Sequence, residues 1–176
     1  MSVPSVPEPA CLVISLLSSR SEAVSMVKQA LEEEFGSMEE VIGPLEFTFT
    51  NYYDSELGQG ISRHLLVFNE LIDRSNLCRV KLMTNDLERV FMHDQSRVFN
   101  LDPGLLTLGN FVLATGKNNA HRIYLDHGIF ADLTLIFRRG SFRALEWTYP
   151  DYSDQKMIET LNLLREKYKC KLMRLS

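Results

Sequence analysis

The sequence predicts an α+β domain in which a mixed, largely antiparallel sheet is covered by helices. Residues 10–17 form a continuous apolar run, which is typical of a strand buried on both faces. Residues 120–146 alternate apolar and polar side chains through two turns, which predicts a C-terminal three-stranded meander. Residues 157–168 carry an apolar stripe at helical spacing and predict a C-terminal helix. Because hairpins outnumber strand–helix–strand crossovers in this order of elements, the class is α+β.

The N-terminal part is expected to begin with a disordered tail. Residues 1–9 contain three prolines, which resist both helix and central strand, so a single domain is expected over residues 10–176. After the first strand, Ser19 and Glu22 have the spacing of a capping box, in which each side chain bonds the backbone amide of the other residue. The apolar stripe over residues 24–35 then predicts a helix.

The middle of the chain is expected to alternate strands and helices. Alternation of apolar and polar residues predicts half-buried strands over 45–50 and 62–68. Helical spacing of apolar residues predicts a helix over 77–90, and a short strand is expected over 97–101. The apolar stretch 105–114 fits either a helix or a strand, and we favour a helix.

The register of the meander can be inferred from its first turn. If residues 126–128 form a three-residue loop, Arg122 lies opposite Asp132, an ordinary cross-strand ion pair that contributes about 0.2–1 kcal/mol. His121 then shares a face with apolar neighbours, which favours a core-facing, hydrogen-bonded histidine over a catalytic one. A slip of one residue would remove both inferences, because it moves every side chain to the other face.

Composition and charge restrict the class of function. The net charge is −4, with 7 Lys and Arg against 15 Asp and Glu in residues 1–94, and 12 against 8 in residues 95–176. Overall acidity argues against nucleic-acid binding, whereas the basic half suits a small anionic ligand, the acidic half of another copy, or simply a solvated face. No apolar run approaches the about 18 residues that span a bilayer, and no secretory leader is recognised. With three widely spaced cysteines, we expect a cytoplasmic protein without membrane association.

Complete signatures of known catalytic chemistry are missing from the sequence. Residues 58–62 lack the serine between two glycines that a nucleophile elbow requires. The turn at residues 18–21 contains no glycine, and the glycines between 109 and 117 have the wrong spacing for a phosphate-binding loop. The four histidines do not have metal-ligand spacing, so no metal is expected and the cofactor is unknown.

Polar residues at expected chain breaks remain as candidates for a site. Asn100, Asp102 and Gly104 belong to a predicted Asp-Pro-Gly turn, and Asp151 or Ser153 is expected to cap the last helix. Loops at strand ends often carry sites, because a rigid sheet positions them. Turn and cap chemistry explains the same residues without a ligand, so both interpretations stay open.

Four stretches of the chain have a specific combined pattern. They are Phe49-Thr50-Asn51-Tyr52-Tyr53 with Glu56 and Gly58, Asn100-Leu101-Asp102-Pro103-Gly104 with Leu106-Thr107, His121-Arg122-Ile123-Tyr124-Leu125, and Trp147-Thr148-Tyr149-Pro150-Asp151-Tyr152. Together they resemble an uncharacterised prokaryotic family, domain of unknown function 4416, known for its Asp-Pro-Gly motif. The resemblance covers nearly the whole chain and implies no activity. Some members carry a GTP-binding label, but this sequence lacks a Walker lysine motif and an NKxD-like motif, so no nucleotide is inferred.

Two functional hypotheses follow. In the first, the chain binds or acts on a small anionic ligand, such as a phosphate-bearing one, in a pocket built from strand-end loops. Its catalytic candidates are Asp102, His121 and Asp151, and its ligand-binding candidates are Tyr53, Asn100, Gly104, Thr107, Lys117, Arg122 and Tyr149, with Arg138 as a further cation. In the second, the chain is a noncatalytic protein-interaction module or a homo-oligomer. The first hypothesis requires Asp102, Arg122 and Asp151 to converge in one concave pocket, and it leaves open whether the protein is an enzyme.

Overall fold

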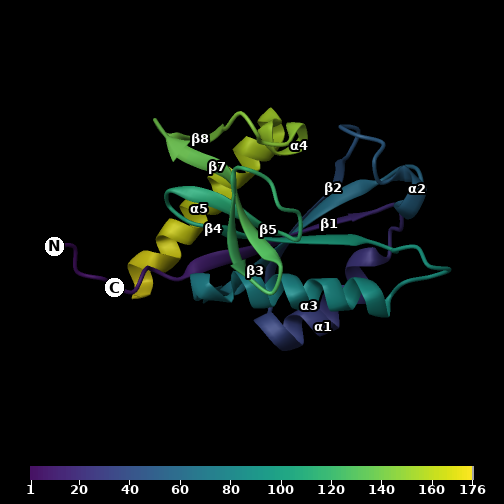
Figure 1. Cartoon of the computed structure of the whole chain (residues 1–176), viewed down its shortest axis with the longest axis horizontal. Helices are drawn as coiled ribbons and strands as arrows, with labels where there is room; N and C mark the ends of the chain where they lie inside the picture. The colour runs from purple at the N-terminus through teal and green to yellow at the C-terminus, as the bar shows by residue number, and fades with distance from the viewer. Residues whose placement is uncertain (176) are drawn as a thin grey trace.

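The structure is a computed structural model that describes residues 1–175, which form an open antiparallel sheet of eight strands with helices on both faces (Figure 1). The strands are β1 (Ala10–Ser18), β2 (Met38–Glu46), β3 (Ser62–Ile72), β4 (Asn100–Leu106), β5 (Asn110–Thr115), β6 (Arg122–Asp126), β7 (Ile129–Arg138) and β8 (Ser141–Ala144). The helices are α1 (Ala23–Phe35), α2 (Asp54–Leu57), α3 (Leu77–Val90), α4 (Pro150–Ser153) and α5 (Gln155–Leu175), with a 3-10 helix η1 (Arg74–Asn76) before α3. The strands follow the order β2-β3-β1-β4-β5-β7-β6, and β8 pairs with the C-terminal half of β7. The predicted α+β class is confirmed.

The first strand lies inside the sheet and is buried along its whole length, as its continuous apolar run predicts. It pairs with β3 on one side and with β4 on the other. One sheet face packs against α4 and α5 through a core that includes Val13 and Leu161. The opposite face packs against α1 and α3 through a second core that includes Ile14, Val27 and Val80 (Figure 1).

The predicted C-terminal meander and helix are confirmed, whereas the predicted cap of that helix is wrong. The strands β6, β7 and β8 form the expected antiparallel meander, and Arg122 lies opposite Asp132. The expected C-terminal helix is α5, but Asp154 rather than Asp151 or Ser153 caps it, since its Oδ2 accepts a backbone N–H of the first turn at 2.9 Å. Within residues 1–175, no helix combines the length and the apolar character needed to cross a membrane.

The pairing between β4 and β5 is short, so the sheet forks between these two strands. Residues 104–106 of β4 pair with residues 111–113 of β5. Among the described strands, residues 100–103 pair with β1 alone, and residues 114–115 pair with β7 alone. The N-terminal half of β4 therefore has a free edge that faces the end of β5.

The helix predicted over residues 105–114 is wrong. These residues contain the end of β4, a turn and most of β5. A buried apolar run of this length fits both states, and here pairing to neighbouring strands selects the extended one. The expected Asp-Pro-Gly turn is likewise part of β4. Pro103 is tolerated there because its nitrogen points into the fork, on the same strand edge as Leu101, where no strand requires a donor.

Two N-terminal predictions also need correction. The strand expected over residues 45–50 lies earlier, as β2, because an outermost strand half-buries alternate residues and therefore carries a weak apolar signal. Ser19 and Glu22 form no capping box within the described chain; the Ser19 hydroxyl instead donates to the Leu57 carbonyl. Residues 1–9 have no regular secondary structure.

Candidate functional site

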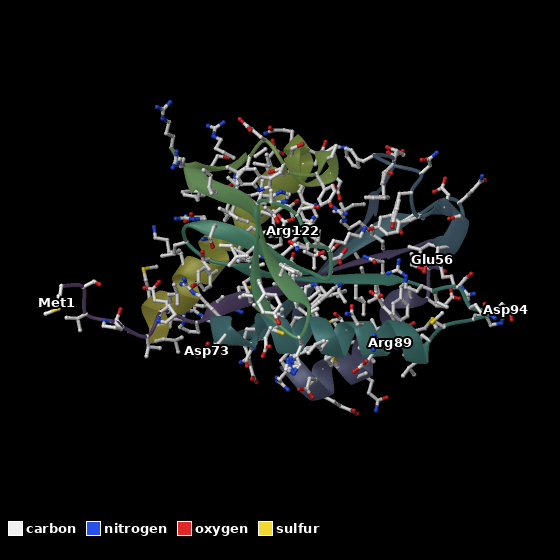
Figure 2. All side chains as sticks on the ribbon, viewed as in Figure 1. Met1, Glu56, Asp73, Arg89, Asp94 and Arg122 are labelled. Carbon is white, nitrogen blue, oxygen red and sulfur yellow. The ribbon has the colours of Figure 1, made fainter. Side chains whose placement is uncertain are left out.

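A cavity of about 650 Å³ lies at the fork between β4 and β5. Its walls come from the end of β1, the segment before α2, β3, α3, β4, the end of β5 with the loop that follows, and α4. Figure 2 shows Arg122, one of the lining residues, within the dense group of side chains in the middle of the molecule. A cavity of this size is typical of sites that hold small molecules.

The residues that the ligand hypothesis requires to converge do line this one cavity: Asp102, Arg122 and Asp151. Four further sequence candidates also line it: Tyr53, Asn100, Lys117 and Tyr149. They come from four separate segments of the chain, so the sheet and its connections, rather than sequence proximity, bring them together.

Three candidates with polar or turn signatures lie outside the cavity lining of the described residues. Gly104 serves packing, because a Cβ at this position would come within 2.7 Å of Phe111 Cζ. Thr107 closes the turn between β4 and β5, where its Oγ1 accepts the Asn110 backbone N–H at 3.0 Å. Arg138 is exposed at the end of β7.

His121 lies behind the cavity wall rather than in the core or in the lining. Its ring stacks on Trp147 with centroids 5.1 Å apart. Its Nε2 lies 3.4 Å from Asp132 Oδ2. His121 thus contacts the carboxylate that pairs with Arg122, and it can act on the site only through that pair.

Two charged side chains of α3 take the place of the missing strand at Leu101. Lys81 Nζ donates to the Leu101 carbonyl at 2.7 Å, and the Leu101 N–H donates to Glu88 Oε1 at 2.6 Å. Both side chains are buried. Because an unsatisfied buried polar group costs about 1–3 kcal/mol, these two bonds allow β4 to separate from β5.

Sequence reasoning missed Lys81 and Glu88, since charges on an amphipathic helix usually belong to a solvated face. A signal was nevertheless present. Both residues share one face of α3 with Thr84 and the buried Leu77, at the i, i+4, i+7, i+11 spacing of a helix stripe. Polar residues that continue the spacing of an apolar stripe on a helix indicate that their side chains are buried.

Asp102 continues the hydrogen-bonded group of Lys81 and Leu101 into the cavity. Its Oδ1 accepts from Lys81 Nζ at 3.0 Å and its Oδ2 from Asn100 Nδ2 at 2.6 Å. Burial would raise the pKa of the Asp102 carboxyl, but the Lys81 ammonium and these hydrogen bonds outweigh burial and hold that pKa below its usual range. For Glu88, burial is the stronger influence and raises the pKa of its carboxyl.

Arg97, which sequence reasoning also missed, ties three elements together beside Asp102. Its guanidinium binds Glu56 of α2 through two bonds of 2.6 and 2.7 Å. It also donates to Glu88 at 3.0 Å and to Asn100 Oδ1 at 2.6 Å. These bonds fix the segment around α2 against α3 and β4, which shapes one wall of the cavity.

Arg63 of β3 and Asp151 of α4 form a second buried ion pair in the wall. The Arg63 guanidinium lies between the rings of Phe47 and Tyr152, 5.0 and 4.7 Å from their centroids. Burial raises the pKa of the Tyr152 phenol to about 12, so this phenol is protonated at neutral pH. Asp151, expected to cap a helix, instead holds Arg63 in place between two aromatic rings.

Arg122 is the centre of a third group of hydrogen bonds. Its Nε donates to Asp132 Oδ2 at 2.8 Å, its Nη1 to the Lys117 carbonyl at 2.9 Å and its Nη2 to Tyr149 Oη at 2.9 Å. The side chain is 1% exposed and that of Asp132 6% exposed. The pairing partner was predicted, but the pair is buried rather than an ordinary surface pair. Burial would lower the pKa of the Arg122 guanidinium, and the bonds to Asp132 and Tyr149 outweigh it and raise that pKa.

Lys117 differs from the other lining cations. Within residues 1–175 it has no carboxylate partner, and its Nζ lies 4.8 Å from the ring centroid of Tyr52. Both side chains are exposed at the rim of the cavity.

Inside the described chain, no group of three or more His, Cys, Asp or Glu side chains is placed to hold a metal ion.

The fold and the cavity define the class of protein: an α+β domain with an open antiparallel sheet that forks around a polar, aromatic-lined cavity. The chain belongs to the family described as Domain of unknown function (DUF4416), whose model matches residues 8–168. This match confirms the family resemblance and includes every residue that lines the cavity. No curated protein and no solved structure matches the chain significantly.

Proposed function

We propose that the protein binds a small anionic ligand in the cavity at the β4–β5 fork, with phosphate-bearing molecules as the leading class. The position of Lys117 carries this proposal. Four other cations line the cavity in the described chain, and each pairs with a carboxylate: Arg63, Lys81, Arg97 and Arg122. Lys117 lacks such a partner there, so its charge is available to an anion.

Aromatic side chains provide a second element of recognition. Tyr52, which lies under the Lys117 ammonium, packs edge to face on Tyr53 with ring centroids 5.0 Å apart. Phe49 and Tyr53 continue this aromatic surface along the cavity wall. A ligand can therefore pack its carbon skeleton against the rings while its anionic group pairs with Lys117.

Arg122 supports this site without contributing free charge. Three of its nitrogens are already engaged, and one of them binds the Lys117 carbonyl. This bond fixes the backbone at Lys117, so that the lysine side chain starts from a defined position at the rim. We therefore assign Arg122 a positioning role.

The test is a thermal-shift screen followed by calorimetry with inorganic phosphate, sugar phosphates and small carboxylates. A ligand at about 100 times its dissociation constant stabilises the fold by about 2.7 kcal/mol. We expect Lys117→Met to weaken binding of the anions found by about tenfold or more, since a charged hydrogen bond contributes about 1.5–3 kcal/mol.

Lys28→Met is the matched control, because Lys28 is exposed on α1 away from the cavity. It should bind the same anions as the wild-type protein. Equal affinity of the wild type and Lys117→Met for every anion would refute the proposal.

A second candidate function is a noncatalytic interaction module or homo-oligomer, and β6 favours it. This outermost strand exposes three consecutive apolar side chains: Ile123 at 71%, Tyr124 at 57% and Leu125 at 39%. The opposite outermost strand, β2, is protected by Pro44 and by ion pairs of its glutamates with α5. An unprotected apolar edge suits strand addition by another chain.

Sedimentation distinguishes this candidate from the first. A self-associating protein should change its oligomeric state when Ile123→Lys places a charge on the β6 edge. A protein that is monomeric at 100 times the concentration used for binding assays would refute the homo-oligomer.

A further inference from the structure

Asp102 is the carboxylate that is open to the cavity. Its side chain is 31% exposed, against 8% for Glu88 and 12% for Asp151. The other lining acids, including Asp132 at 6%, are buried more deeply and hold protein partners. Asp102 is therefore the most accessible of the acidic groups that line the cavity.

The hydrogen bonds of Asp102 leave capacity for a ligand. Each of its oxygens accepts one bond within the described chain, from Lys81 and from Asn100. An ionised carboxylate has about four acceptor positions, which leaves about two for donors on a bound molecule. Two neighbouring hydroxyl groups match this capacity.

A cationic group suits this position poorly. Lys81 Nζ is 3.0 Å from Asp102 Oδ1. Besides burial, which raises the pKa of the Asp102 carboxyl, and the bonds from Lys81 and Asn100, which lower it, the charge of Arg63 lowers this pKa by a smaller amount. A ligand ammonium would approach these cations and meet repulsion from them. Neutral donors such as hydroxyl groups avoid that repulsion.

Tyr53 adds a second hydrogen-bonding group beside Asp102. Both residues line the same cavity, and burial, followed by the charge of Asp102, raises the pKa of the Tyr53 phenol. Within residues 1–175 the Tyr53 hydroxyl makes no hydrogen bond. The Tyr53 hydroxyl therefore has unused hydrogen-bonding capacity in the cavity.

The two strands that separate at the fork, β4 and β5, bring different polar groups to the cavity. Asp102 lies on β4 and lines the cavity with Tyr53, whereas Lys117 lies in the loop after β5. The β4 side offers acceptors for hydroxyl groups, and the β5 side offers a cation for an anionic group. A molecule that uses both must carry several hydroxyls and one anionic group.

We infer that the ligand is a polyhydroxylated anion of the sugar phosphate or sugar acid type, with hydroxyls that donate to Asp102 and an anionic group on Lys117. The inference rests on the proposed anion-binding function and specifies its ligand class. The monosaccharide part fits a cavity of about 650 Å³ and packs its carbon face against the tyrosines at the rim.

Calorimetry with five probes tests the inference: ribose 5-phosphate, gluconate, propyl phosphate, ribose and glycine. We expect ribose 5-phosphate or gluconate to bind at least tenfold more tightly than propyl phosphate, and the stronger of the two identifies phosphate or carboxylate as the anion. Ribose and glycine should bind more weakly still. Tyr53→Phe, which keeps the ring, should lower affinity for the strongest polyol several-fold and leave propyl phosphate unchanged.

Asp102→Asn is the second variant and should reduce affinity for the polyol relative to propyl phosphate, with folding checked by circular dichroism. If neither ribose 5-phosphate nor gluconate binds more tightly than propyl phosphate, and propyl phosphate binding is sensitive to Lys117→Met, the polyol inference is overturned and the anion-binding function stays intact. Tighter binding of glycine would overturn the inference as well. Binding of ribose without any phosphate or gluconate would overturn both.

Discussion

Substitution of Lys81 by methionine tests whether α3 replaces a strand at the fork. The change keeps the length of the side chain and removes the ammonium that bonds the Leu101 carbonyl at 2.7 Å and Asp102 at 3.0 Å. Loss of the bond to a buried carbonyl costs about 1–3 kcal/mol. Breaking a buried ion pair costs about 3–5 kcal/mol, but Asp102 is about a third exposed, so its share is smaller. We expect Lys81→Met to lower the free energy of unfolding by about 2–4 kcal/mol in total.

Urea denaturation measures this change, with Lys28→Met as the exposed control. The control should stay within about 0.5 kcal/mol of the wild type. The double variant with Asp102→Asn should lose less stability than the sum of the two single variants, because Lys81 and Asp102 share one interaction. A value for Lys81→Met that equals the control would show that β4 does not depend on α3 for its hydrogen bonds, and would refute the fork argument.

Three further predictions concern neighbouring residues. Gly104→Ala should destabilise the fold by about 1–3 kcal/mol without a change in anion binding, because the new methyl group displaces Phe111 rather than a ligand; weaker binding at equal stability would contradict this packing role. Arg122→Lys should lower both the melting temperature and anion affinity, since a lysine cannot make all three bonds of the guanidinium; unchanged calorimetry would contradict its positioning role. Asp102 has a folded-state pKa below its unfolded value of about 3.8, so its contribution is complete above that pH and is lost as pH falls through the folded pKa; the stability difference between the wild type and Asp102→Asn should thus be constant from pH 5 to 8 and shrink below about 3.8.

The parts of the fold that sequence reasoning predicted are those with strong local periodicity. The buried run of β1, the alternating meander and the apolar stripe of α5 each carry their signal within about ten to twenty residues. The opposition of Arg122 and Asp132 was predicted from a three-residue loop; the structure reaches the same register with Asp126 opposite Ile129 and a register shift between Tyr124 and Asp126. Burial of this pair could not be predicted, because it depends on Tyr149, which lies 27 residues away, and on an irregular neighbouring loop that brings the Lys117 carbonyl onto the guanidinium.

The parts that were missed depend on contacts between distant segments. Residues 105–114 are extended because β1 and β7 offer edges to them, and an apolar run does not record which partners exist. The same limit applies to the site. Asp102 and Asp151 had plausible roles in a turn and a cap, and only their partners on α3 and β3 show that neither role is used.

The fork also explains why the cavity contains so many charges that are already paired. Once β4 separates from β5, the Leu101 backbone and the free strand edge need hydrogen-bond partners, and Lys81 and Glu88 supply them from α3. Their charges then need partners of their own, which Asp102 and Arg97 provide. These pairs follow from the architecture and would be needed without any ligand. Among the cavity-lining groups of residues 1–175, those with capacity that the architecture does not use include the ammonium of Lys117, the remaining acceptor positions of Asp102 and the Tyr53 hydroxyl. These groups, rather than the number of charges, point to a bound molecule.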